Sequence, residues 1–136
     1  MNRLENTCHR CKIDAVFADT DASGRVHFSK ILTYVERAEH QLLSSLDIAV
    51  HDSGKIGWPR VRVNCDFIAG IKFEDEVEVL LELSKLGTSS LSWKFEIVGR
   101  SDALAASGEM ITVKVAADGR ATAISDRERS KLERLL

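Results

Sequence analysis

The sequence predicts an α+β fold, in which a curved five-stranded antiparallel sheet wraps around one long helix. One segment, at about 29–46, has the 3.6-residue period of an amphipathic helix, whereas the later apolar segments alternate with a period of two. Short turns join most of these segments, and no strand–helix unit repeats to require a parallel sheet. With 136 residues, 44% of them hydrophobic, the chain is expected to form a single domain over 1–136.

The first strand is expected at about 12–18, where Ile13, Val16 and Phe17 are apolar. After an acidic turn, Ser29 stands where the N-cap of the long helix belongs, because its hydroxyl can accept hydrogen bonds from free N–H groups of the first turn. The apolar residues of this helix share one face, which predicts that this face packs on a sheet. They are Leu32, Val35, Leu42, Leu43 and Leu46.

Four strands are expected after the helix, at 60–67, 76–83, 91–97 and about 105–116, because apolar and polar residues alternate there. The Gly-Thr-Ser sequence at 87–89 has the composition of a hairpin turn between two of them.

A charged tail at about 126–136 is expected to form a short helix. One long helix cannot cover both faces and both edges of a five-stranded sheet. The sheet is therefore expected to pair with a second subunit, which makes the protein at least a homodimer.

Composition and charge argue against several kinds of partner. A net charge of -2 and a pI near 6.1 do not suit a nucleic-acid-binding surface, which needs clustered Lys and Arg. No apolar run approaches the ~20 residues that span a bilayer, and the N-terminal segment lacks the hydrophobic core of a secretory signal. We therefore expect a cytoplasmic protein with no nucleic-acid partner and no membrane span.

The cysteines do not indicate a disulfide framework or a metal site. Cys8, Cys11 and Cys65 are an odd number, which suits reduced thiols. The Cys8–Cys11 pair has the C-x-x-C spacing of a zinc or redox site, but no second ligand pair follows it downstream. We expect free thiols and no metal.

The most informative segment is DTDASGRVHF, at 19–28, which places two carboxylates beside a glycine just before the long helix. Asp, Ser and Gly are also the usual residues of a solvated turn, so an acidic loop without function is the alternative interpretation. If the segment is extended, Asp19 and Asp21 share a face, and their mutual repulsion raises the pKa of one of them.

This segment resembles the D-T-D-x-x-G-x-V pattern of acyl-CoA thioesterases of the hotdog fold, in the branch similar to 4-hydroxybenzoyl-CoA thioesterase. The similarity continues through the residues at 34–38, which resemble the pattern Y-x-E-R-A, and through Asp66, Phe67 and Asp75. Gly70 departs from the family, which often has proline there, and so does Glu74, where glycine is common.

The resemblance implies a hotdog fold that assembles as a dimer or a homotetramer, and no cofactor. Carried over by position, it makes Asp21 the catalytic carboxylate, either as a general base on water or as a nucleophile that forms a mixed anhydride. It makes the backbone N–H of Phe28 the donor that polarises the thioester carbonyl. Gly24 lets the chain turn so that both groups meet one substrate.

Several other residues are candidates with weaker support. Asp19 is expected to assist at the substrate site, and His27 either orients substrate and moves a proton or mainly packs. Glu36 and Glu39 are carboxylates on the helix and alternative catalytic or substrate-binding groups. Glu39 falls within the apolar stripe, so it is either functional or paired with an Arg or with the dimer seam.

Basic groups near the subunit boundary are expected to contact coenzyme A, with Arg60, Arg62 and Lys72 as candidates. The chain has no G-x-S-x-G elbow and no phosphate-binding glycine motif, which argues against ordinary serine hydrolases, kinases and dehydrogenases. The expected function is hydrolysis of aryl or short-chain acyl-CoA, with 4-hydroxybenzoyl-CoA and 1,4-dihydroxy-2-naphthoyl-CoA both plausible by resemblance. A non-catalytic acyl-CoA-binding or scaffold dimer is the alternative.

Overall fold

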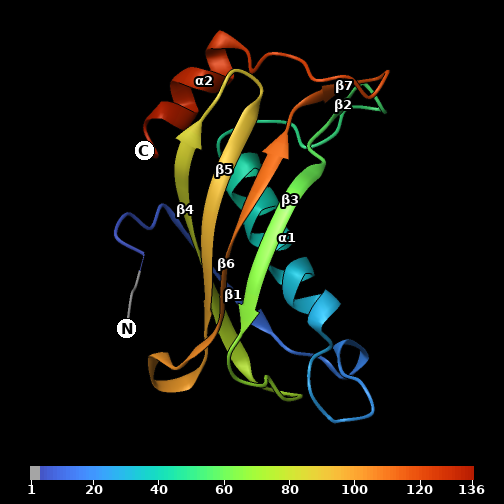
Figure 1. Cartoon of the computed structure of the whole chain (residues 1–136), viewed down its shortest axis with the longest axis vertical. Helices are drawn as coiled ribbons and strands as arrows, with labels where there is room; N and C mark the ends of the chain where they lie inside the picture. The colour runs from blue at the N-terminus through green and yellow to red at the C-terminus, as the bar shows by residue number, and fades with distance from the viewer. Residues whose placement is uncertain (1–3) are drawn as a thin grey trace.

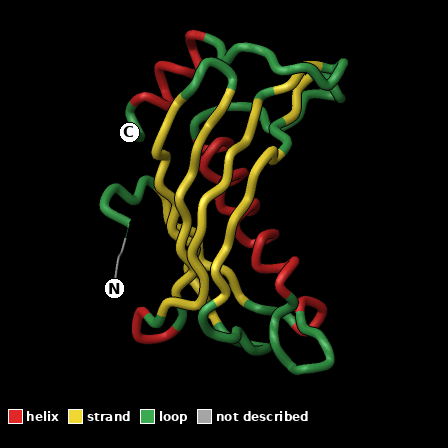
Figure 2. The backbone as a smooth tube through the Cα atoms, in the orientation of Figure 1, coloured by secondary structure: helices red, strands yellow, loops and turns green. Residues whose placement is uncertain are grey.

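A computed structural model describes residues 4–136 and contains the expected sheet and helix. The sheet has five antiparallel strands in the order β1-β4-β5-β6-β3. Figures 1 and 2 show it curving around helix α1, Phe28–Ser45, which lies against one face. The strands are β1 His9–Asp14, β3 Arg60–Phe67, β4 Glu76–Leu86, β5 Ser90–Val98 and β6 Leu104–Val113. The predicted α+β architecture is confirmed.

Smaller elements complete the chain. Two single-turn 3₁₀ helices, η1 Phe17–Asp19 and η2 Arg100–Asp102, lie at turns, and the short strands β2 Ile56–Gly57 and β7 Val115–Ala116 pair with each other. Helix α2, Asp126–Glu133, occupies the charged C-terminal segment and packs near β4.

The core lies between the sheet and α1, as the period-two pattern indicates. Inward side chains of β4 and β5, including Val79, Leu81 and Trp93, are fully buried and face the apolar side of the helix. Tyr34 and Leu43 are the corresponding buried residues on α1. Burial of these apolar side chains, at about 25 cal/mol per Å², is what fixes the helix on the sheet.

Two predicted boundaries are wrong for identifiable reasons. The first strand runs from His9 to Asp14 rather than over 12–18, because Cys11, Ile13 and Ala15 are the inward positions and the chain then turns into η1. The N-cap of α1 is His27 rather than Ser29. The imidazole Nδ1 of His27 accepts the N–H of Ser29 at 3.2 Å, so a ring nitrogen replaces the hydroxyl as the capping acceptor.

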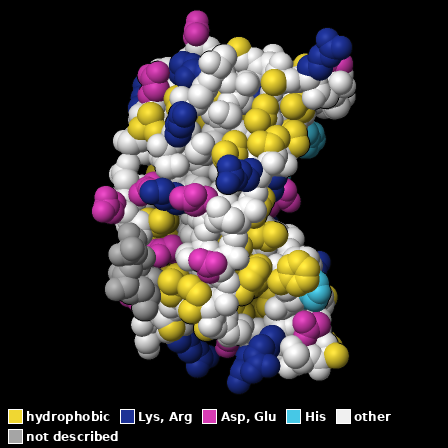
Figure 3. All heavy atoms as spheres, viewed as in Figure 1, with side chains coloured by type: hydrophobic (Ala, Val, Ile, Leu, Met, Phe, Trp, Pro, Cys, Tyr) yellow, Lys and Arg dark blue, Asp and Glu magenta, His cyan; other side chains and the backbone are white. Residues whose placement is uncertain are grey.

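Strand β3 is an edge strand with an uncovered apolar surface. Among residues 4–136 it pairs only with β6, and its side chains Val61 and Phe67 are 61% and 52% exposed. Figure 3 shows hydrophobic side chains gathered along the side of the molecule where β3 lies in Figure 1. An unpaired strand edge of this kind favours pairing with another chain.

Candidate active site

The segment at 20–26 forms a tight turn ahead of α1. Thr20 and Val26 form a β-bridge, and the N–H of Asp21 donates to the carbonyl of Arg25 at 2.9 Å. At the tip, Gly24 has a φ of +80°, a left-handed conformation that a side chain would strain. The predicted need for glycine at this position follows from that backbone geometry.

The carboxylate of Asp21 lies on the outside of this turn. Its Oδ1 accepts the N–H of Ser23 at 2.8 Å and the Ser23 hydroxyl at 2.5 Å. These two hydrogen bonds stabilise the charged form, so they lower the pKa of Asp21 below its ordinary value. Asp21 is therefore ionised at neutral pH, as a base or nucleophile must be, and it is exposed in the single chain.

Asp19 has a different environment from Asp21. Its Oδ2 accepts the hydroxyl of Tyr34 at 2.6 Å, and its backbone carbonyl accepts the N–H of His27 at 2.9 Å. Burial, followed by this hydrogen bond to Asp19, raises the pKa of Tyr34. Asp19 thus ties the loop to α1. The like-charge increase in pKa expected of an extended segment is not found at Asp21, because the hydrogen bonds from Ser23 lower its pKa.

The backbone N–H of Phe28 is positioned as a donor. Phe28 is the first residue of α1, and its N–H has no acceptor among the described residues. Free N–H groups at a helix N-terminus carry partial positive charge and suit a developing oxyanion. The centroid of the His27 ring lies 4.5 Å from that of the Phe28 ring, and its Nδ1 accepts the N–H of Ser29. His27 therefore packs against Phe28 and caps the helix.

An apolar groove opens beside Phe28, with a volume of about 210 Å³. It lies between the start of α1 and the end of β3, and the Phe28 and Phe67 rings meet edge to face with centroids 6.2 Å apart. Ile31, Ile68 and Ile71 also line it. The groove adjoins the exposed edge of β3, so a second subunit on that edge would enclose it.

Glu36 and Glu39 lie further along α1 and share one cation. Both carboxylates pair with Arg60, Glu36 at 3.1 Å and Glu39 through Arg60 Nη2. Glu39 is 0% exposed, and its Oε2 has no hydrogen-bond partner among the described residues. Burial outweighs the attraction of Arg60 and raises the pKa of Glu39 to about 6. The sequence left open whether Glu39 is functional, faces the dimer seam or pairs with an Arg, and the structure shows the pairing with an Arg.

The geometry separates these helical carboxylates from the loop. Eight residues of α-helix between Phe28 and Glu36 span about 12 Å. Arg60, expected to contact coenzyme A, is engaged by the two glutamates, whereas Arg62 lines a small hollow beside Asn64 and Glu109.

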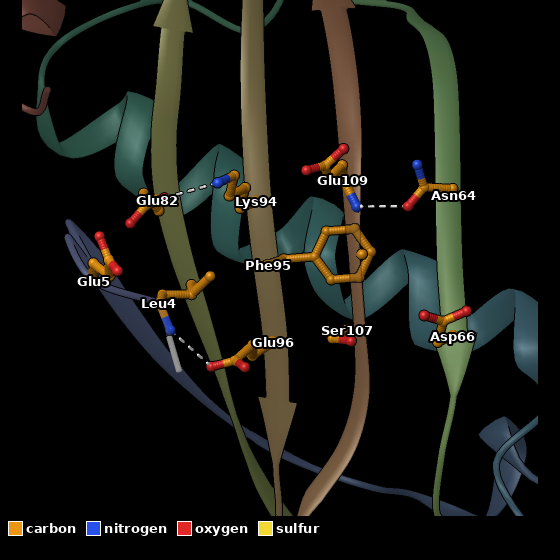
Figure 4. Close-up of a pocket in the computed structure, with 11 residues that line it drawn as sticks. Leu4, Glu5, Asn64, Asp66, Glu82, Lys94, Phe95, Glu96, Ser107 and Glu109 are labelled. Carbon is orange, nitrogen blue, oxygen red and sulfur yellow. Dashed lines mark hydrogen bonds and ion pairs between the residues drawn. The ribbon is translucent and has the colours of Figure 1, made fainter. Parts of the chain in front are cut away.

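A larger hollow, of about 720 Å³, lies on the opposite face of the sheet from α1. Figure 4 shows its lining side chains on β3, β4, β5 and β6, with the helix behind the strands. Its charged residues are Glu5, Asp66, Glu82, Lys94, Glu96 and Glu109. Five carboxylates against one ammonium would repel the phosphates of coenzyme A, so volume alone does not mark the catalytic site.

Within residues 4–136 no group of three or more His, Cys, Asp or Glu side chains could hold a metal ion. Cys8, Cys11 and Cys65 are free thiols, and burial raises the pKa of Cys8. None of the described helices is long and apolar enough to cross a membrane.

Residues 23–106 match the family model of the Thioesterase superfamily, which is more than half of the chain. The chain belongs to the thioesterase superfamily. This membership confirms the hotdog family inferred from the acidic motif, and it establishes thioester hydrolysis as the general activity. No curated protein is significantly similar to the chain in sequence.

Solved structures of other thioesterases share the fold. A thioesterase from Thermus thermophilus, in complex with coenzyme A and Zn, is 25% identical with a TM-score of 0.83, over 97% of this chain and 96% of that chain. The 1,4-dihydroxy-2-naphthoyl-CoA thioesterase from Synechocystis is 22% identical with a TM-score of 0.84, over 93% of this chain and 96% of that one. The DHNA-CoA thioesterase from Staphylococcus aureus is 22% identical with a TM-score of 0.81, over 93% and 86%.

The structure also adds residues to the site that the sequence did not single out. Tyr34 anchors Asp19, although its only signal in the sequence was its place in the Y-x-E-R-A pattern. Phe67, whose signal in the sequence was its place beside Asp66 in the family pattern, and Ile68 line the groove from the end of β3, nearly 40 residues beyond Phe28. Only the fold brings them together.

Proposed function

We propose that this thioesterase hydrolyses aryl or short-chain acyl-CoA thioesters, with Asp21 as the catalytic carboxylate and the Phe28 N–H as the oxyanion donor. One observation carries the proposal: a single turn presents an ionised carboxylate and leads into a free helix-terminal N–H beside an apolar groove. The carbonyl would face the N–H and the acyl group would occupy the groove. The 4-hydroxybenzoyl and 1,4-dihydroxy-2-naphthoyl thioesters are the leading candidates.

Hydrolysis requires only modest help from these groups. In the general-base route, Asp21 removes a proton from water, the water oxygen bonds to the carbonyl carbon, and the C–S bond breaks to release the coenzyme A thiolate. The thiolate leaves readily, so no strong acid is needed. The Phe28 N–H stabilises the charge on the carbonyl oxygen, a contribution of about 2.7–4 kcal/mol for such donors.

The proposal includes a second copy of the chain on the edge of β3. The exposed side chains Val61 and Phe67 would be covered, and the groove beside Phe28 would become a closed acyl site. Closing the site also excludes water other than the one that reacts. A dimer is the smallest assembly that achieves this, and the homotetramer suggested by the resemblance would build on it.

The decisive variant is Asp21→Asn, assayed by thiol release over a panel of benzoyl- and short-chain acyl-CoA thioesters. We expect kcat/KM to fall by about 10²–10⁴-fold with the oligomer unchanged. Asp118→Asn is the matched control, because Asp118 also caps a turn in front of a glycine and accepts a backbone N–H, at 2.9 Å, far along the chain. An Asp21→Asn enzyme as active as this control would transfer the catalytic role to Glu36 or Glu39.

Two further measurements address the catalytic route and the non-catalytic alternative. In a single turnover in oxygen-18 water, label enters the carboxylate of Asp21 only if a mixed anhydride forms and is cleaved by water. Label confined to the released acid shows that water attacked the acyl carbon, which is the result expected of a general base and also of an anhydride cleaved at that carbon. Tight binding of acyl-CoA with no turnover by the unmodified protein would support the scaffold alternative.

A further inference from the structure

We propose that Arg25 is a specificity-determining residue, which binds a carboxylate at the far end of the acyl group that enters the groove beside Phe28. This inference rests on the proposed function, because it assumes that the groove receives the acyl group. It changes the expected class of substrate to acyl groups with an apolar body and a carboxylate end, which the 4-hydroxybenzoyl and 1,4-dihydroxy-2-naphthoyl groups lack.

Arg25 is a charged residue beside an apolar groove. Arg25 lines the groove that is otherwise formed mostly by apolar residues, among them Phe28, Phe67 and Ile68. It is three residues from Phe28, so their Cα atoms are at most about 11 Å apart. The guanidinium is therefore the charged group beside the apolar walls.

The guanidinium is also available. Within residues 4–136, the Arg25 side chain makes no hydrogen bond or ion pair, although Arg10, Arg60 and Arg127 each pair with a carboxylate. An unpaired guanidinium presents a planar set of donors that matches a carboxylate with two parallel hydrogen bonds. Such pairing is strengthened beside an apolar groove, where less water competes.

Gly70 leaves open the space that the Arg25 side chain occupies. A Cβ at position 70 would lie 2.6 Å from both Cδ and Nε of Arg25, so the arginine lies across the bare glycine backbone. Gly70 does not have a left-handed backbone, and no turn geometry requires glycine there. The glycine is explained by the space that Arg25 occupies, and this is one of the two positions that depart from the family pattern.

The alternative ligand for Arg25 is a phosphate of coenzyme A. Basic side chains gather at the end of the molecule where the 20–26 turn lies (Figures 1 and 3). The pantetheine arm, however, separates the thioester sulfur from the pyrophosphate by more than the distance from Phe28 to Arg25. We therefore assign Arg25 to the acyl side, and the test below distinguishes the two sources of the anionic oxygen.

The experiment compares two thioesters of matched shape, 4-carboxybenzoyl-CoA and 4-methylbenzoyl-CoA, with glutaryl-CoA and valeryl-CoA as an aliphatic pair. The unmodified enzyme should prefer the carboxylate-bearing member of at least one pair. In Arg25→Gln the ratio of kcat/KM between the two members should fall about tenfold or more, as expected for a charged hydrogen bond. The same ratio should fall with N-acetylcysteamine thioesters, which lack phosphates.

Gly70→Ala is the second variant, because its methyl group displaces Arg25 without removing the charge. It should reproduce most of the fall in the ratio, and adding it to Arg25→Gln should change little more. Lys72→Gln is the charge-matched control: Lys72 is bridged to Arg25 along the backbone but does not line the groove. It should leave the ratio between paired substrates unaltered.

Two results would overturn the inference: no preference in the unmodified enzyme, or an unchanged ratio in Arg25→Gln. If the ratio is unchanged because both members of each pair fall equally, Arg25 acts on the coenzyme A side. Failure of the proposed function is distinguishable, because it appears as full activity in Asp21→Asn whatever the substrate ratio. Absence of turnover with every thioester would overturn both.

Discussion

Helix α1 and the turn that precedes it have carboxylates in opposite environments. In the turn, Asp21 is exposed, is hydrogen-bonded by Ser23, and has a lowered pKa. In the middle of the helix, Glu39 is buried, is paired with Arg60, and has a pKa raised to about 6. The same functional group is thus held charged and accessible at one place and inaccessible at the other.

This difference indicates that Asp21 and Glu39 have different roles. A catalytic carboxylate must be ionised and must reach substrate. Of these two residues, Asp21 is exposed and has a lowered pKa, whereas Glu39 is buried. Glu39 instead joins α1 to the first residue of β3 through Arg60, at the strand whose outer edge is unpaired. We infer that the loop end of the helix serves catalysis and that the middle holds the edge strand in position.

The largest effect on stability is expected from breaking the buried pair. Arg60→Ala leaves the Glu39 carboxylate buried without its cation and should lower the free energy of unfolding by about 3–5 kcal/mol. Replacing both residues, as Glu39→Leu with Arg60→Met, should restore most of this loss. Urea unfolding at a fixed protein concentration measures both.

The control is the exposed pair between Arg10 and Glu78, at 3.0 Å. Arg10→Ala should cost no more than about 1 kcal/mol, because exposed ion pairs contribute little. Equal effects of Arg60→Ala and Arg10→Ala would contradict the structural role assigned to the middle of α1.

A smaller effect is expected from the titration of Glu39. Its pKa in the folded chain is about 6, above the ordinary value of 4.5. Folding therefore favours the protonated form, and this stabilising contribution is complete below pH 4.5 and is lost as the pH rises through 6. At pH 7 the loss is about 2 kcal/mol by linkage.

Glu39→Gln removes this dependence while it keeps the shape of the side chain. Unfolding free energies of the unmodified protein and the variant, compared between pH 4.5 and 7, should converge at the acid end and diverge toward neutral pH. Parallel curves over this range would show that Glu39 titrates normally.

The comparison also explains how far the sequence could predict the molecule. Val77, Val79, Leu91 and Trp93 are buried where the alternation placed them, because a period-two pattern has one apolar face whatever the rest of the chain does. The acidic motif was found because its residues are contiguous. Its family was predicted from that motif and confirmed by the superfamily match.

Features that depend on contacts between distant residues could not be predicted. The partner of Glu39 required knowing that Arg60, 21 residues later, begins the strand beside the helix. The N-cap was assigned to Ser29 because hydroxyls are the usual capping groups, and only the geometry of the turn places the ring of His27 there. The position of Arg25 over Gly70 likewise depends on the folded loop.

The smallest expected effect tests the link between the loop and the helix. Tyr34→Phe removes the hydroxyl that donates to Asp19 at 2.6 Å and leaves the buried ring in place. We expect a loss of about 1.5 kcal/mol in unfolding free energy, at the low end for a hydrogen bond to a charged group, because the half-exposed Asp19 carboxylate can be rehydrated.

The loss of this hydrogen bond should also change kcat, because the bond positions the loop that contains Asp21. Tyr34→Phe should lower kcat several-fold with little change in KM. Ser45→Ala, which removes a hydroxyl that donates to Leu42 at the other end of α1, should affect stability only.

In a double-mutant cycle, Asp19→Asn and Tyr34→Phe should be strongly non-additive, since each variant removes the same bond. Additive effects, or an unaltered kcat in Tyr34→Phe, would mean that the turn holds Asp21 without its anchor on the helix.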